Sequence, residues 1–142
     1  MMLDTFQKHL DDVSATLMAG DFDAYMKLIT VPLVVMTEKE TVLVKDIEDF
    51  RTGFDSYAGM LRTELATDLI RLASAVTEYG PNLITGRYET HILRAGQRIY
   101  GPHQAAMTLR REHGSWKASG LVNPAFEERW PFKSIARREA GA

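Results

Sequence analysis

Hydrophobic residues in the first half of the chain recur at helical spacing. Over 3–17 the apolar side chains follow one another at alternating steps of three and four residues, the pattern of an amphipathic helix. Asp21 follows a glycine and is placed to cap a short second helix, "DFDAYMKLI". A third helix opens at Asp46 and carries an apolar stripe as far as Leu61. The pattern therefore predicts three helices before the chain changes period.

The remaining segments alternate or run as short apolar stretches, which indicates strands. Two β-rich runs, "PLVVM" and "TVLV", surround the polar turn "TEKE". Four longer runs follow: "LIRLASAVT", "NLITGRYETHIL", "RIYGPHQAAMTLRR" and "SWKASGLVN". The short segments between them contain Gly or Pro, which supply the dihedral angles of tight turns. Helices grouped before a long antiparallel meander predict an α+β fold, with the helices packed on one face of a curved sheet.

The hairpin around "RAGQ" allows the two faces of the sheet to be assigned. If Ala95 and Gly96 form its two-residue loop, Arg94 faces Gln97, and the register then pairs Tyr88 with His103. The face with more apolar side chains is expected to be the buried one, because burying unpaired charges costs several kcal/mol each. This inner face comprises Ile84, Tyr88, Ile92, Ile99, Ala105, Met107 and Leu109. Pro102 has no N–H for the strand ladder and could mark a bulge that reverses the alternation locally.

The stretch "GRYETHI" places a base, an acid and an imidazole on the opposite, outer face. Arginine and tyrosine are common at protein interfaces, so this face is predicted to form a homodimer. The predicted contact residues are Arg87, Glu89, His91, Tyr100, Gln104 and Arg110. If the register were reversed, the same row would line a pocket instead.

Candidate chemistry on the inner face centres on one histidine. An imidazole at His103 near the phenol of Tyr88 could act as an acid/base pair in an enclosed apolar space. The alternative is a core histidine that is hydrogen-bonded to Tyr88. Arg71 is open in direction because "EYGP" does not fix the loop length, but if it points inward it would anchor an anion or a carboxylate. His9 is expected on a helix surface.

Composition and charge restrict the class of protein. The chain has 142 residues, 45% hydrophobic and 25% charged, which suits one soluble globular domain. No apolar run approaches the ~18 residues of a membrane span, and the N-terminus is not a signal peptide, so we expect a cytoplasmic protein without membrane contact. The sequence has no cysteine, which excludes thiolate chemistry. Its net charge of −2 gives no sign of the basic surface that binds nucleic acid. No metal spacing, P-loop or dinucleotide motif appears, so no cofactor is expected.

Four segments carry a resemblance to a known family: "LMAGDFDAYMKLI", "VPLVV", "ITGRYETHILRAGQRIY" and "LRREHGSWKAS". Over 3–123 the chain resembles the nuclear transport factor two-like superfamily, and within it the SnoaL-like group. The resemblance implies a cone-shaped roll, in which a strongly curved, mostly antiparallel sheet wraps three N-terminal helices around a pocket. It also implies a homodimer formed by the convex face. The domain is expected to cover 1–125, followed by an extension over 126–142 that is partly docked and then frayed.

The sequence departs from catalytic relatives of this superfamily at the positions that matter. Val13 stands where ketosteroid isomerase has its oxyanion tyrosine, and the general-base aspartate would fall near Met36 or Thr37. The second acid would fall among 105–107, where no acid occurs. The isomerase reaction is therefore not expected here.

The most economical hypothesis is a mostly apolar pocket that binds a small organic molecule, of the size of aromatic or polyketide-like ligands. Its expected lining comprises Tyr25, Met36, Phe54, Tyr57, Tyr88, His103 and Met107, with Arg71 if it points inward. One alternative is a cofactor-independent isomerase, cyclase or dehydratase that uses His103 and Tyr88. Another is a structural or interaction domain with a filled core. Fold alone does not decide among them.

Overall fold

The computed structural model describes residues 2–123, which form three helices and six strands. In chain order these are α1 (Met2–Ala19), α2 (Phe22–Met26), β1 (Ile29–Met36), β2 (Thr41–Val44), α3 (Ile47–Thr63), β3 (Asp68–Glu78), β4 (Leu83–Arg94), β5 (Gln97–Glu112) and β6 (Ser115–Val122). The predicted extension over 126–142 lies outside the described residues. Within 2–123, no helix is long and apolar enough to cross a membrane.

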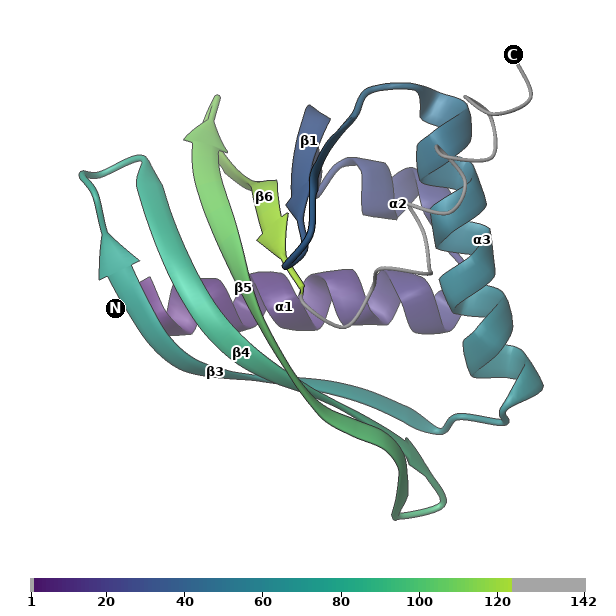
Figure 1. Ribbon diagram of the computed structural model, residues 1–142. Helices are drawn as coiled ribbons and strands as arrows, with labels where there is room; N and C mark the ends of the chain where they lie inside the picture. Colours follow the sequence, from purple (N-terminus) through teal and green to yellow (C-terminus); the bar gives the residue numbers. More distant parts are fainter. Residues whose placement is uncertain (1, 124–142) are drawn as a thin grey trace.

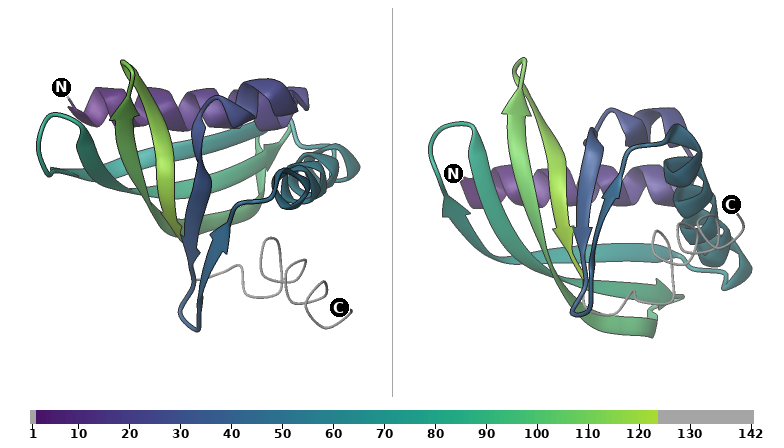
Figure 2. Two further views of the ribbon diagram at one scale, coloured as in Figure 1. Left: turned by 90° about the horizontal axis from the view of Figure 1, so that it is seen from above. Right: turned by 45° about the horizontal axis from the view of Figure 1, so that its top comes forward.

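The six strands form one strongly curved sheet in the order β2-β1-β6-β5-β4-β3 (Figure 1). Neighbouring strands are antiparallel except for β1 and β6, which are parallel. Seen from above, the sheet bends around one side of the molecule, α1 lies along the other side, and α3 stands at one end (Figure 2). The predicted α+β cone, with a mostly antiparallel sheet around three helices, is therefore confirmed.

The helices end where the sequence indicates. Gly20 adopts a φ of +70°, which an L side chain rarely tolerates, and it stops α1. Asp21 then caps α2, because its side-chain Oδ1 accepts a hydrogen bond of 3.1 Å from the backbone N–H of Ala24. The short loop between α1 and α2 turns the second helix back toward the sheet.

The core lies between α1 and the inner face of the sheet. The ring of Phe6, on α1, is fully buried and lies directly over Gly86 of β4. A Cβ at position 86 would overlap that ring, so the glycine is what allows helix and strand to approach so closely. Leu10, Ile84 and Leu109 complete this part of the core.

The β4–β5 hairpin begins in the predicted register and then shifts. Arg94 pairs with Gln97 as expected, but two irregularities near Ile92 move the pairing by two residues. His103 consequently faces Thr90, and Tyr88 faces Ala105, so the predicted pairing of Tyr88 with His103 is wrong. A shift of two keeps the alternation of faces beyond the irregularity, because side chains on a strand repeat every second residue. Six of the seven predicted inner residues are buried: Ile84, Tyr88, Ile92, Ala105, Met107 and Leu109. The seventh, Ile99, is only partly buried.

A bulge beside Pro102 explains the one residue on the wrong face. Gly101 has a φ of +100°, and a Cβ there would collide with the carbonyl oxygen of Thr90. This local geometry turns both Tyr100 and His103 inward, although they are three residues apart. Tyr100 was predicted on the outer face; the structure places it inside.

His9 is buried within the core rather than on the helix surface. Its exposed fraction is only 5%, because α1 buries a face wider than the apolar stripe, and the imidazole hydrogen-bonds the backbone at Leu28 after α2. Within the described residues, its Nε2 has no hydrogen-bond partner. Burial lowers the pKa of His9 from 6.5 to about 4, although the Asp12 carboxylate partly opposes this shift.

This burial predicts an acid-sensitive fold. The unfolded chain takes up the His9 proton near pH 6.5 and the folded chain only near pH 4, so stability is complete above pH 6.5 and is lost as the pH falls toward 4. The expected loss is on the order of 3 kcal/mol. Urea unfolding of His9→Leu should show a clearly flatter pH dependence over that window. His113→Asn, in an exposed turn, should behave like the wild type. An equally steep profile for His9→Leu would contradict the assignment.

Candidate functional site

A cavity of about 110 Å³ lies between the helices and the inner face of the sheet. Residues of all three helices and of five strands line it, so no single element forms the site. Of the residues that we predicted from the sequence, seven line this cavity: Tyr25, Phe54, Tyr57, Arg71, Tyr88, His103 and Met107.

One predicted residue lies elsewhere. Met36 is 39% exposed and is not part of the lining, whereas its neighbour Val35 lines the cavity. The strand alternation puts these two side chains on opposite faces, and the sequence run "PLVVM" has too few polar residues to show which face is buried.

The structure adds polar groups that were not among the predicted lining residues. Thr90 lies on β4 between two predicted inner residues, and alternation alone could have identified it. Tyr100 enters through the bulge, for which Gly101 and Pro102 were the only signal. Asn123, at the end of the last strand, is 9% exposed and also lines the cavity.

Aromatic rings from α2 and α3 form one wall. The rings of Tyr25 and Phe54 have centroids 5.0 Å apart, and Phe22 lies 5.5 Å from Phe54 in an edge-on arrangement. Such tilted pairs fix the orientation of α2 against α3. Burial raises the pKa of Tyr25 from 10.0 to about 12, so its hydroxyl remains protonated at neutral pH and can donate a hydrogen bond.

The direction of Arg71, which the sequence left open, is inward. Arg71 Nη1 donates a 3.1 Å hydrogen bond to Ser14 Oγ on α1. The guanidinium carbon of Arg71 lies 5.8 Å from the centre of the Tyr57 ring. The backbone of this strand is held in place by Gln7, which donates to the Arg71 carbonyl at 2.6 Å and accepts from the N–H of Ala73 at 2.8 Å.

Among the described lining residues, Arg71 has no carboxylate partner. None of the described lining residues is an Asp or a Glu, and the buried Nε of Arg71 has no hydrogen-bond partner within 2–123. The nearby phenols do not supply a negative charge, because burial raises the pKa of Tyr88 above its ordinary 10.0 and that of Tyr25 to about 12. The described part of the cavity therefore carries one uncompensated positive charge.

The predicted pair of His103 and Tyr88 shares the cavity without a direct bond. Both residues line it, but no hydrogen bond joins their side chains in the described structure, since the shifted register places His103 opposite Thr90. His103 is the only imidazole among the described lining residues.

The row in "GRYETHI" lies on the outer face, away from this cavity. Glu89 Oε1 lies 3.1 Å from His91 Nε2, and its Oε2 accepts a 3.3 Å hydrogen bond from Gln104. Arg98 approaches the other ring nitrogen of His91 at 3.5 Å. These residues satisfy one another at the surface. Within 2–123, no three His, Asp or Glu side chains are grouped as metal ligands.

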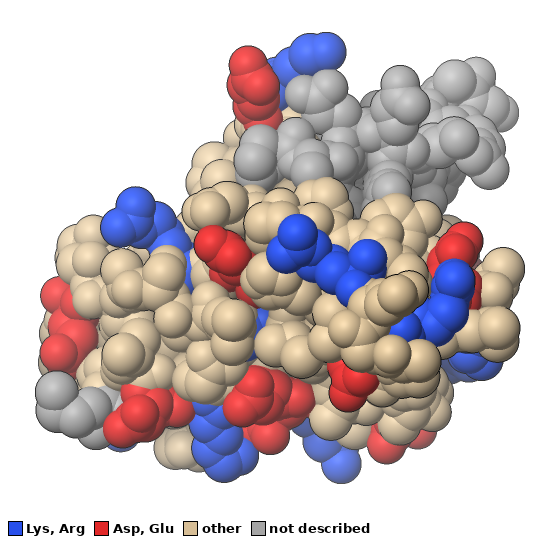
Figure 3. Space-filling model, turned by 90° about the horizontal axis from the view of Figure 1, so that it is seen from below, with Lys and Arg blue, Asp and Glu red and all other residues tan. Residues whose placement is uncertain are grey.

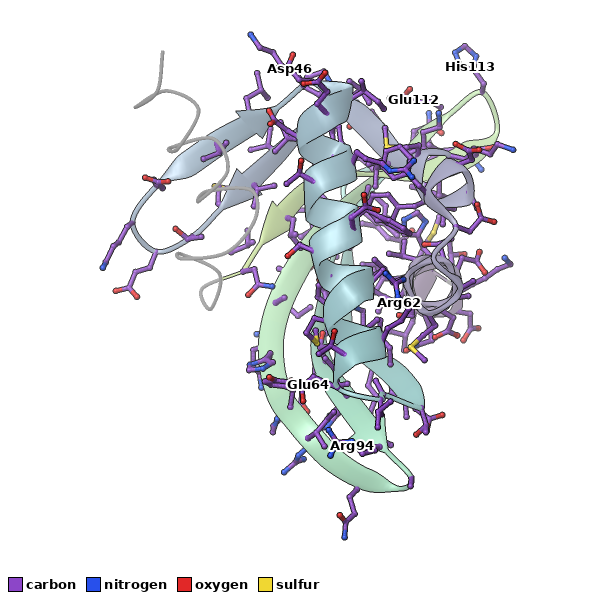
Figure 4. All side chains as sticks on the ribbon, turned by 90° about the vertical axis from the view of Figure 1, so that its right-hand side faces the viewer. Asp46, Arg62, Glu64, Arg94, Glu112 and His113 are labelled. Carbon is purple, nitrogen blue, oxygen red and sulfur yellow. The ribbon has the colours of Figure 1, made fainter. Side chains whose placement is uncertain are left out.

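The tip of the β4–β5 hairpin is tied to the end of α3. Figure 4 shows Glu64 close to Arg94, with α3 standing across the sheet. Arg94 Nε donates to the Glu64 carbonyl at 2.7 Å, and its Nη2 lies 3.4 Å from the Glu64 carboxylate. This contact holds the curved end of the sheet against α3, both of which line the cavity.

Comparison with known proteins gives structural relatives only. A scan against protein-family models finds no match, and a search of curated proteins finds no similar sequence. Among solved structures, a nuclear transport factor two-like protein of unknown function from Shewanella oneidensis is similar, with a TM-score of 0.65 and 11% identity over 87% of this chain and 99% of that one. A protein provisionally assigned as a ketosteroid isomerase from Shewanella frigidimarina has a TM-score of 0.60 and 11% identity, covering 81% of this chain and 90% of that one. A protein of unknown function with a cystatin-like fold from Nostoc punctiforme has a TM-score of 0.61 and 12% identity, covering 87% and 92%.

These similarities define the class by its fold. The chain has the fold of the nuclear transport factor two-like superfamily, as the sequence resemblance predicted. At such low identity the relatives show fold and not activity. The finer SnoaL-like assignment stays a prediction.

Proposed function

We propose that the protein binds a small organic molecule in the cavity between the helices and the sheet. The observation that carries this proposal is the cavity of about 110 Å³, whose walls are largely aliphatic and aromatic but which also presents Arg71, His103 and several tyrosine hydroxyls. Apolar walls with a few convergent polar groups are typical of ligand sites. A filled interaction domain, the third alternative, would not leave this space.

The volume limits the ligand. It is of the same order as a cavity that holds benzene, ~150 Å³. The proposed ligand therefore has a core of about one ring, smaller than the polyketide-like molecules that the sequence suggested.

A cavity-filling variant tests the binding proposal. Native mass spectrometry of freshly purified protein is expected to detect a bound small molecule that is lost on denaturation. Val13→Phe should reduce this adduct while costing little stability, because Val13 faces free space. Val44→Phe is the matched control: Val44 is fully buried and outside the lining, so overpacking should cost ~1–3 kcal/mol. Equal destabilisation by both variants, with no adduct in the wild type, would contradict the proposal.

An enzymatic use of the same cavity is the alternative. It would make His103 the general base and Tyr88 a hydrogen-bond donor to a substrate carbonyl, as an isomerase, cyclase or dehydratase requires. The inward direction of both side chains supports this idea. Burial raises the pKa of Tyr88, so its hydroxyl stays protonated, as a hydrogen-bond donor to a carbonyl requires.

His103→Ala separates the two possibilities. If the protein is an enzyme, this change should lower kcat/KM by ~10²- to 10⁴-fold on a substrate that the wild type converts, with an unchanged melting temperature. A lower melting temperature combined with intact ligand binding would identify His103 as a structural residue.

We further propose that the outer face of the sheet forms a homodimer. Several apolar side chains on this face are exposed, among them Leu72 (51%), Val122 (40%) and Met36 (39%). Strand pairing sets Leu72 beside Glu89, and Val122 between Met36 and Ala106, so the apolar groups surround the polar cluster. Charges of both signs are interspersed on the face seen from below, with no large field of one sign to repel a second copy (Figure 3). Of the residues predicted for this contact, all but Tyr100 remain candidates: Arg87, Glu89, His91, Gln104 and Arg110.

Charge reversal at Glu89 tests the dimer. In a two-fold contact the patch meets itself, so Glu89 of one copy can approach an arginine of the other. Glu89→Lys should weaken association at least ~10-fold, more strongly at low salt. Glu38→Lys, in the exposed β1–β2 turn, makes the same charge change away from this face. Sedimentation should show a dimer for the wild type and Glu38→Lys. An unchanged dimer in Glu89→Lys would place the interface elsewhere.

A further inference from the structure

We propose that the ligand of the cavity is a small organic acid, whose carboxylate binds Arg71 and whose apolar body lies against the walls. This inference rests on the proposed binding function and names its ligand class. It assigns to Arg71 a recognition role, with the hydroxyls of the surrounding tyrosines as additional donors.

The first argument is the missing counter-charge. A guanidinium keeps its charge at every physiological pH, and a partly buried charge without a partner is unfavourable. Ser14 satisfies one nitrogen of Arg71, and the described lining residues include no acid. The Nε remains buried and without a partner within 2–123. A ligand carboxylate in the cavity would supply the missing negative charge to the guanidinium.

The second argument is the set of donors around the guanidinium. Tyr57 lies beneath it, with the ring centre 5.8 Å from the guanidinium carbon. Tyr25 and Tyr88 line the same cavity as Arg71, whose charge partly opposes the burial that raises the pKa of both hydroxyls. Burial keeps these phenols protonated, so they can donate hydrogen bonds and compete poorly as anions. An arginine with neutral O–H donors around it favours a bound oxyanion.

The third argument concerns which oxyanion fits. Arg71 is the one permanent cation among the described lining residues, so it neutralises a singly charged carboxylate, whereas a doubly charged phosphomonoester carries one charge more than Arg71 compensates. The rest of the lining includes Val13, Leu17 and Ile92, which suit a hydrocarbon or aromatic body. A small alkyl carboxylate or an aryl carboxylate with a single ring matches both the charge and the volume.

Arg71 is also fixed in position before any ligand arrives. Gln7 hydrogen-bonds the backbone on both sides of Leu72, and Ser14 holds the side chain. Both residues lie on α1, so one rigid helix orients the strand and the guanidinium together. Preorganisation of this kind reduces the entropy that is lost on binding.

The experiment compares benzoate with benzamide, which has the same shape but no charge. Titrations followed by ¹H–¹⁵N NMR would measure the affinity of each compound and identify which residues respond. In the wild type, resonances of cavity residues should move, and benzoate should bind at least ~10-fold more tightly than benzamide, as expected for hydrogen bonds to a charged group. Arg71→Met should weaken benzoate binding ~10- to 100-fold and change benzamide binding less than ~3-fold.

Arg62→Met is the matched control, because it removes the same charge from the exposed surface of α3. It should bind both compounds like the wild type. Should Arg71→Met fail to fold, Arg71→Gln replaces it, with the same selective loss of benzoate expected.

The outcomes separate the ligand class from the binding function. The carboxylate assignment would be overturned if benzamide bound in the cavity as tightly as benzoate, or if benzoate bound equally to the wild type and the Arg71 variant. Either result would leave the pocket proposal standing. If neither compound moves the resonances of a cavity residue, both the ligand class and the binding function are contradicted.

Discussion

The close contact between α1 and the sheet determines the rest of this structure. It depends on Gly86, whose missing side chain leaves room for the ring of Phe6. One residue further along α1, the amide of Gln7 bonds the backbone of β3, the edge strand next to β4. The aromatic contact supplies buried apolar area, while the amide satisfies edge groups that would otherwise need water or another strand. Together they set both the distance and the register of the helix against the sheet.

The position of the cavity follows from this docking. In the N-terminal half of α1, Phe6 and Leu10 pack into the core against the sheet. Farther along the helix, Val13 and Leu17 line the cavity, together with residues of α2 and α3. The helix therefore closes the core at one end and lines a pocket at the other. Because Gln7 fixes β3, Arg71 points into that pocket. Structural support and the proposed ligand recognition thus depend on the same helix.

The sequence predicted the helices and the meander because their hydrophobic periodicity is strong. It predicted the buried face of the sheet because the opposite face carries charges that would be unpaired if they were buried. It predicted less where periodicity is interrupted. The two register shifts near Gly101 moved His103 away from Tyr88 and brought Tyr100 inside, since each added residue changes the register without changing the composition. Arg71 was open because its direction depends on a loop length and on Gln7, which is 64 residues away in sequence. The run before Met36 was too uniformly apolar to reveal its inner face.

The chemistry of the cavity is more restrictive than its fold. An enzyme of this fold that removes a proton from carbon with a carboxylate base needs an Asp or a Glu in its cavity. The described lining contains neither. What it contains instead is one permanent cation, the phenols of Tyr25 and Tyr88, which burial keeps protonated, and one imidazole on another strand. A guanidinium and hydroxyl donors stabilise a negative charge that is already present on a ligand. They would equally stabilise a negative charge that develops during a reaction. Binding an acid and stabilising an enolate would therefore use the same Arg71 and differ only in whether His103 can reach a proton. The orientation of that imidazole relative to a bound carboxylate decides between a carrier and an enzyme.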